Sequence, residues 1–208
     1  MDNPSPDQKS LIEWHAAFRA VPGEVISGDL HVVVPFSNGV LVAVIDGLGH
    51  GELAAAAAGI AANELSKHWG GSLVSLLSSC HNTLRGSRGA VMNIACLSAR
   101  PQRLSWLGVG NVEGVLLRAD PAARPTREYL HQRPGIVGQH LPSVQESVVP
   151  LFPGDTLVFA TDGIKSSFIS ELNLGGSPRR MADEILLRSG KEWDDALVLV
   201  ARYLGGSP

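Results

Sequence analysis

The chain of 208 residues is long enough to bury a sizeable core, and its 44% hydrophobic and 18% charged residues are typical of a globular protein. Its formal net charge of −3, with no cluster of Lys or Arg, argues against a surface for nucleic acid or anionic membranes. The sequence has no apolar window of about 18 residues, no signal-peptide pattern at its start, and only two cysteines.

These features predict a cytoplasmic protein with no membrane span, no nucleic-acid partner and no disulfide framework. The polar, proline-bearing residues 1–10 are expected to form a flexible tail, and residues 205–208 a frayed C-terminus. Between them, residues 11–204 are expected to form a single domain.

The first half of the chain predicts a hairpin followed by two helices. Apolar strands are expected at 30–36 and 40–45, with a tight turn between them. A helix rich in strong helix formers is expected at 52–69, and its alanines would let it pack closely on a sheet. A second helix is expected at 72–86, where Gly86 can end it.

The second half predicts mostly short antiparallel strands, read as one meander and separated by Pro, Gly and Asn turns. These strands are expected at 90–99, 103–109, 113–119, 126–131, 144–151 and 156–161. A third helix at 177–189 precedes a last strand at 196–204. Because most strands lack a helix between them, the pattern favours a layered α+β fold over a doubly wound parallel sheet.

Acidic residues stand at the ends of several predicted strands, beside flexible glycines. They are Asp29, Asp46, Asp162 and the doublet Asp194–Asp195. Taken singly, each is best explained as a turn or cap residue. If they converge, their mutual repulsion calls for a cation, and an all-oxygen set of ligands suits Mg²⁺ or Mn²⁺.

The stretch VIDGLGHG, residues 44–51, resembles a glycine-rich phosphate loop but fails the known patterns. A dinucleotide site needs G-x-G-x-x-G, whereas here the third glycine comes one position early, and the G-K-[ST] of a Walker loop is absent. Asp46 would also repel a pyrophosphate. The chain is therefore not expected to bind a nucleotide here.

Five segments in this order and spacing resemble the metal-dependent PPM (type 2C) serine/threonine protein phosphatases. They are SGD (27–29), VIDGLGHG, GVGNVEGVLLR (108–118), LFPGDTLVFATDGIKSS (151–167) and DDALVLV (194–200). Within that family the chain is similar to the SpoIIE-type branch and its stand-alone, RsbX-like feedback phosphatases of stressosome pathways. The resemblance implies a four-layer αββα sandwich of two antiparallel sheets flanked by helices.

The resemblance also implies a centre of two Mn²⁺ or Mg²⁺ ions and a metal-activated water that attacks the phosphate, without a phospho-enzyme. The metal ligands it implies are Asp29, Asp46, the carbonyl of Gly47, Asp162 and Asp194. Asp46, Asp162 and Asp29 are the expected catalytic residues. Asp195 replaces Asp194 if the doublet is shifted by one position.

Three departures from the family pattern affect the expected site. Asn111 stands where many relatives have an aspartate that helps to hold a third metal, so a third ion is not expected. Arg19 is a weak candidate for the phosphate-gripping arginine of eukaryotic members, and Leu197 replaces a threonine. His50 is either a proton donor to the leaving serine oxygen or a loop imidazole bonded to backbone.

By resemblance, the expected substrate is a phosphoserine or phosphothreonine of a STAS-domain protein, bound by a monomeric enzyme in stress signalling. Recognition is expected from the surface around the acids, including segment 164–178. One alternative is a catalytically silent regulator that keeps the fold and binds a phosphoprotein without turnover. Another is a metal-dependent hydrolase of a small phosphoester.

Overall fold

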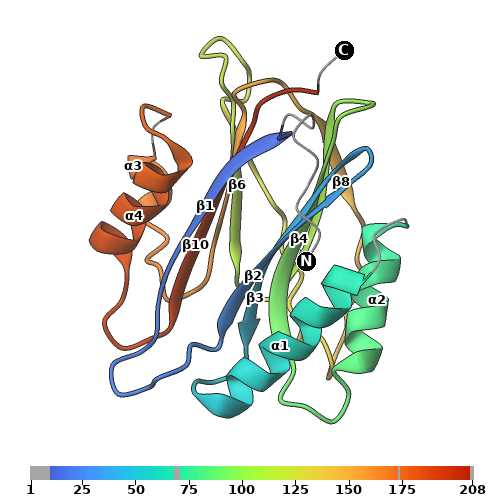
Figure 1. The fold of residues 1–208 in the computed structure, drawn as a ribbon, viewed down its shortest axis with the longest axis vertical. Coiled ribbons are helices and arrows are strands. Elements are labelled where there is room, and N and C mark those ends of the chain that lie inside the picture. The colour runs from blue at the N-terminus through green and yellow to red at the C-terminus, as the bar shows by residue number, and fades with distance from the viewer. Residues whose placement is uncertain (1–9, 68–70, 173, 207–208) are drawn as a thin grey trace.

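The computed structural model describes residues 10–67, 71–172 and 174–206, and in these residues two five-stranded antiparallel sheets face each other (Figure 1). The strands of the first sheet, in spatial order, are β1 (Ile12–Arg19), β10 (Ala196–Tyr203), β9 (Thr156–Ala160), β6 (Glu113–Leu117) and β7 (Arg127–Tyr129). Those of the second sheet are β2 (Asp29–Phe36), β3 (Gly39–Gly47), β4 (Ala90–Ser98), β5 (Arg103–Val109) and β8 (Ser147–Pro150).

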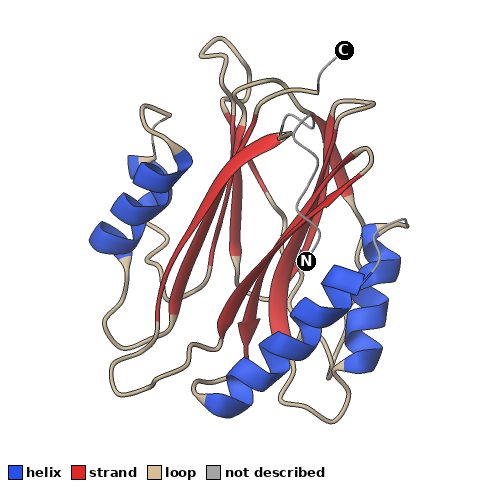
Figure 2. Cartoon of the chain, in the orientation of Figure 1, coloured by secondary structure: helices blue, strands red, loops and turns tan. Residues whose placement is uncertain are grey.

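Helices cover the outer face of each sheet (Figure 2). α1 (Glu52–Lys67) and α2 (Leu73–Thr83) pack on the second sheet, and α4 (Pro178–Ser189) packs on β1 and β10 of the first, with the short α3 (Phe168–Glu171) beside it. None of the described helices combines the length and the apolar character needed to span a membrane.

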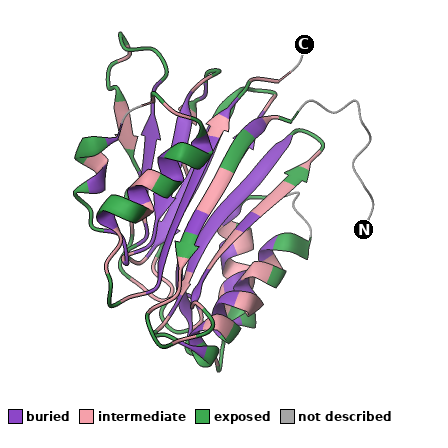
Figure 3. Ribbon diagram, turned by 60° about the vertical axis from the view of Figure 1, so that its left-hand side comes forward, coloured by how far each residue is buried: buried purple, intermediate pink, exposed green. Residues whose placement is uncertain are grey.

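Three layers of apolar side chains hold the four layers of backbone together. One lies between the sheets and contains Trp106, Phe159 and Tyr203. A second lies under α1 and α2, and a third under α3 and α4. Buried residues accordingly line the strands and the inward faces of the helices (Figure 3). The predicted αββα sandwich is confirmed, because each sheet buries both of its faces.

Most predicted elements are present, with shorter ends in several cases. The hairpin pairs Phe36 with Gly39, as expected for a tight turn. The second helix ends at Thr83, ahead of Gly86, which has a positive φ of 85°. The helix predicted to start at residue 177 uses Ser177 as its N-cap, whose hydroxyl accepts a hydrogen bond from the backbone N–H of Arg180.

Three features differ from the sequence-based expectations. No strand was predicted at β1 and no helix at α3. The short strands do not form one meander, because the chain crosses from β5 to β6 in the other sheet and returns at β8. Period-two patterning predicts a strand but does not name its partner, so the pattern could not show these crossings.

The predicted ends of the domain are only partly visible. Residues 1–9 and 207–208 lie outside the described residues, as do 68–70 at the end of the first predicted helix. The division into a tail, one domain and a frayed end therefore stays a prediction.

Candidate active site

Asp29 and Asp46 lie side by side because β2 and β3 pair in register. The first residue of β2, Asp29, is the direct partner of Asp46 near the end of β3. The backbone next to Asp46 is tightly held, since a Cβ on Gly47 would lie 2.1 Å from the carbonyl oxygen of Ala54 in α1. Only glycine fits where the strand turns into the helix.

Asp162 and the acidic doublet come from the other sheet. Asp162 follows β9, and Asp194–Asp195 precede β10, which pairs with β9. A Cβ on Gly163 would lie 1.8 Å from the carbonyl oxygen of Asp195, so the two segments approach as closely as their backbones allow. Opposite sheets thus deliver carboxylates to the same end of the sandwich.

The two members of the doublet have different surroundings. Asp195 is buried, and its two carboxylate oxygens accept hydrogen bonds from the backbone N–H groups of Val21 (2.7 Å) and Gly28 (2.6 Å). Asp194 is partly exposed and lines a cleft together with Asp46 and Asp162. We call this space, whose lining also includes Asn111 and His50, the acidic cleft.

Burial and crowding raise the pKa values of these acids. The pKa of Asp46 is raised from 3.8 to about 8, mainly by burial and then by the negative charges of its acidic neighbours. The pKa of Asp29 is raised to about 7 by burial, against a hydrogen bond from Thr161 Oγ1 at 2.8 Å. The pKa of Asp194 is also raised, first by burial and then by the charge of Asp162, and Lys191 opposes the rise.

The chemistry of these residues fits a pair of hard cations. Their donor atoms are carboxylate oxygens, which Mg²⁺ and Mn²⁺ prefer. Asp46, Asp162 and Asp194 share one cleft whose described lining has no Lys or Arg, and Asp29 is buried beside Asp46 outside that lining. In the described residues, no three Asp, Glu, His or Cys side chains are already drawn around a common point as a bound ion requires. Carboxylates that repel one another favour such an open arrangement until a cation offsets their charge.

Hydrogen bonds around the acids include partners that the sequence did not suggest. Thr161 donates to Asp29 and accepts from the backbone N–H of Leu197 at 2.9 Å, so it ties β2 to the first sheet. The amide of Asn111 donates to Asp162 Oδ2 at 2.8 Å. A threonine before an Asp-Gly turn carried no signal by which its role could be predicted.

His50 and Arg19, both considered from the sequence, lie in different places. His50 lines the acidic cleft, and its Nδ1 lies 2.9 Å from Oε1 of Glu24, in the loop between β1 and β2. Its partner is therefore a carboxylate and not the backbone. The guanidinium of Arg19 donates to the carbonyl of Lys191 and does not line the acidic cleft.

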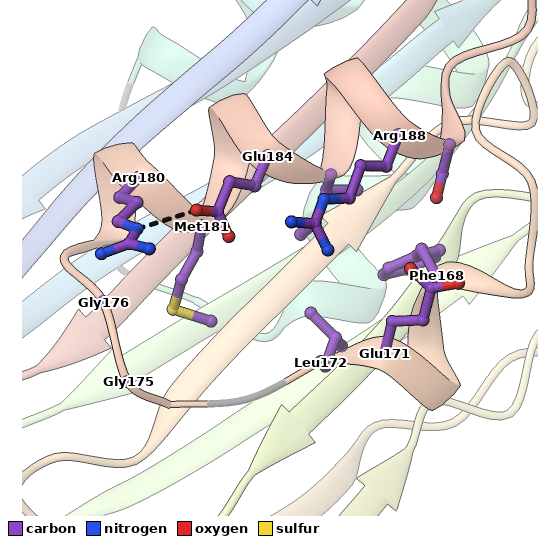
Figure 4. Close-up of a pocket in the computed structure, with 11 residues that line it drawn as sticks. Phe168, Glu171, Leu172, Gly175, Gly176, Arg180, Met181, Glu184 and Arg188 are labelled. Atoms are coloured by element: carbon purple, nitrogen blue, oxygen red, sulfur yellow. Dashed lines mark hydrogen bonds and ion pairs between the residues drawn. The ribbon is translucent and has the colours of Figure 1, made fainter.

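A separate groove runs between α3 and α4 (Figure 4). Phe168, Leu172 and Met181 contribute apolar surface to it, and Arg180 pairs with Glu184 at 2.8 Å on its rim. None of the predicted site residues lines this groove. It is therefore not part of the acidic cleft.

Comparison with known proteins places this geometry in a family. Residues 37–204 match the family model for stage II sporulation protein E (SpoIIE). The phosphoserine phosphatase RsbX of Bacillus subtilis (strain 168) is 22% identical over 186 residues, which cover 86% of this chain and 89% of RsbX.

Solved structures show the same fold over nearly the whole chain. One similar chain comes from a study of the bacterial stressosome as a modular system adapted to control secondary messenger signalling. It has a TM-score of 0.84 at 29% identity, and the match covers 92% of this chain and 99% of that one. RsbX in complex with magnesium has a TM-score of 0.83 at 19% identity and covers 95% and 98%. The PP2C domain of SpoIIE from Bacillus subtilis has a TM-score of 0.76 at 18% identity and covers 95% and 64%.

The family model covers most of the chain, and the fold agrees with the solved structure of RsbX over 95% of it. The chain belongs to the SpoIIE family and is a protein serine/threonine phosphatase of the metal-dependent PP2C type.

Proposed function

We propose that this phosphatase removes phosphate from phosphoserine or phosphothreonine in a STAS-domain protein of a stressosome-type pathway, with two Mn²⁺ or Mg²⁺ ions in the acidic cleft. The observation that carries the metal site is the meeting of Asp46 from one sheet with Asp162 and Asp194 from the other. The similarity to the phosphoserine phosphatase RsbX, and to a chain from a study of the bacterial stressosome, supports the substrate class.

The chain itself offers a ligand set for these ions. Asp46, Asp162, Asp194 and the carbonyl oxygen of Gly47 would hold them, and Asp29 would do so directly or through water. Asp194 is preferred to Asp195, because both oxygens of Asp195 already accept backbone hydrogen bonds. When bound, the ions would supply an activated water and positive charge for the phosphoryl group.

Other side chains would position these carboxylates and move protons. Thr161 orients Asp29, and Asn111 orients Asp162, through the hydrogen bonds given above. As an imidazolium whose Nδ1–H is held by Glu24, His50 would donate the proton on Nε2 to the leaving serine oxygen. An alkoxide is a poor leaving group, so this proton matters most for serine and threonine esters.

A direct assay tests the proposal. The purified protein should release phosphate from a phosphorylated STAS-domain protein in Mn²⁺ or Mg²⁺, and a chelator should abolish the release. Activity that survives chelation would contradict the metal site. Binding of the phosphoprotein without turnover in any divalent ion would instead identify a silent regulator.

The substrate class needs its own comparison. A kcat/KM for the phospho-STAS protein far above that for small phosphoesters is expected, and equal values would favour a small-molecule phosphatase. The monomeric state and the cytoplasmic location stay predictions, and sedimentation of the purified protein tests the first.

A further inference from the structure

A second cleft adjoins the acidic cleft on the far side of Asp162. Asp162 and Asn111 line both spaces, whereas Asp46 and Asp194 line only the acidic one. The remaining residues of the second cleft are Glu113, Ile164, Lys165, Ser166, Ser167 and Lys191. We call it the lysine cleft. A peptide with its phosphoserine in the acidic cleft would reach the lysine cleft with a neighbouring residue.

Backbone pairing fixes the two lysines on one face of this cleft. Ile164 and Gly190 form an antiparallel bridge. On either side of it, Lys165 N–H donates to the carbonyl of Ser189 (2.8 Å), and Lys191 N–H donates to the carbonyl of Gly163 (2.7 Å). Because side chains alternate along paired strands, Lys165 and Lys191, each one residue from the bridge, point to the same side.

Neither lysine forms a close ion pair with a described residue, although the charge of Lys191 acts on Asp194. Among the residues that the structure describes, no carboxylate lies within ion-pair distance of Lys165 or Lys191, although Glu113 lines the same cleft. In the groove between α3 and α4, Arg180 is paired with Glu184 (Figure 4), whereas Arg188 forms no ion pair with a described residue and, unlike the two lysines, lies away from Asp162. The two free ammonium groups beside Asp162 therefore favour an anionic group of a bound molecule.

We propose that Lys165 and Lys191 bind an acidic side chain of the phosphoprotein near its phosphorylated serine or threonine, and so select acid-flanked sites. This inference rests on the proposed phosphatase function. The phosphoryl group itself belongs in the acidic cleft, where Asp46 and Asp194 lie, so the lysines are left for a second negative charge. Ser166 and Ser167 would add hydroxyl donors to the same carboxylate.

Matched phosphopeptides test this selection. One peptide carries glutamates on both sides of a phosphoserine, and a second carries glutamines at the same positions. The unaltered phosphatase should have a kcat/KM about 10-fold higher for the acidic peptide, with a preference that falls as salt is added. In the Lys165→Gln/Lys191→Gln double variant this ratio should fall to about 1.

Two controls separate the lysine cleft from general charge effects. Arg188→Gln removes a positive charge from α4, outside the lysine cleft, and should leave the preference intact. In a Lys165→Glu/Lys191→Glu variant, a lysine-flanked peptide should become the better substrate. A preference that is absent in the unaltered protein, or lost equally in Arg188→Gln, would overturn the inference.

Binding distinguishes failure of this inference from failure of the proposed function. If no divalent ion supports turnover of the phospho-STAS protein or of any peptide, the proposed function fails. Fluorescence anisotropy with a non-hydrolysable phosphonate analogue of the acidic peptide then still tests the cleft. Tighter binding than the glutamine analogue, lost in the double lysine variant, would support it, and equal binding would refute it.

Discussion

The two ends of β9 carry aspartates with opposite surroundings, although both belong to the one segment LFPGDTLVFATDG. Asp155, before the strand, is 1% exposed and accepts hydrogen bonds from the guanidinium of Arg118 (2.7 Å) and the backbone N–H groups of Ala119 (2.9 Å) and Phe152 (3.1 Å). Asp162, after the strand, lies in a cleft with other acids. Arg118 also pairs with Glu128, which completes a buried network.

The charged and hydrogen-bonding partners of a carboxylate, more than the sequence motif around it, therefore decide whether it stabilises the fold or can bind a cation. Asp155 has its charge offset inside the fold, so it stabilises the structure. The acids of the acidic cleft have too little positive charge around them. They can therefore bind a cation, and without one they lower the stability of the fold.

The largest expected effect comes from removing an uncompensated acid. Asp46→Asn should lower the phosphatase kcat/KM by at least about 10²-fold, because it removes an expected metal ligand. The metal-free variant should be as stable as the unaltered protein or more so, since the fold no longer has to keep a buried acid protonated or bear its charge. Phosphate release and urea unfolding in a chelator measure the two effects, and a strong loss of stability would contradict this contrast.

Asp155→Asn should show the reverse pattern. It should lower the free energy of unfolding by about 3 kcal/mol, because it leaves the Arg118 guanidinium with one carboxylate partner in a buried site. The folded variant should keep its metal-dependent activity. Urea denaturation measures the loss, and Glu184→Gln, which breaks an exposed pair on α4, serves as a control with little expected change in stability.

A third carboxylate, that of Glu24, contacts His50, which lines the acidic cleft. His50→Gln should lower kcat on a phosphoserine peptide about 10²-fold, because the leaving oxygen then lacks a proton donor. An aryl phosphate has a good leaving group and should lose much less. Glu24→Gln, which keeps the imidazole, should show a smaller loss, and equal losses on both substrates would remove His50 from proton transfer.

The smallest expected effect is on the pH dependence of stability. The folded protein holds protons on Asp29 and Asp46 up to pKa values of about 7 and about 8, whereas the unfolded chain releases them near 3.8. The free energy of unfolding of the metal-free protein should therefore fall as pH rises through this interval. Its Tm should be lower at pH 8.5 than at pH 5.5 by about 3 °C or more.

Metal should reduce that dependence by offsetting the charge of the ionised acids. Saturating Mn²⁺ is expected to raise Tm more at pH 8.5 than at pH 5.5. Asp46→Asn without metal should show a flatter profile than the unaltered protein. A Tm of the metal-free protein that rises steadily across this range would show that the acids are not held protonated in the fold.

Much of the fold could be predicted from the sequence because its signals are local. Short apolar runs bounded by turn residues located β2, β3, β4, β5 and β10, and Ser177 before Pro178 located the start of α4. β1 escaped prediction because its exposed aromatic residues Trp14 and Phe18 blur the alternation of an edge strand. α3 is a single turn, too short for a helical period.

The candidate site was predicted less completely, for a similar reason. Asp29, Asp46, Asp162 and Asp194 stood out because acids beside glycines at strand ends form a recognisable pattern, and the family resemblance gave them roles. Those roles as metal ligands stay predictions. Thr161 and Glu24 form no such pattern, because their partners Asp29 and His50 lie far away in the sequence. The two lysines come together only through the bridge between Ile164 and Gly190.

The sequence by itself determined most strands and helices and which acids stand at their ends, since these depend on neighbours a few residues away. Only the tertiary structure decided that Asp195 turns inward to the N–H groups of Val21 and Gly28 while Asp194 faces the cleft. It likewise decided that Asp155 is neutralised by Arg118 and that Asp46 is not. Charge compensation depends on distance in space, and the packing of two sheets sets that distance.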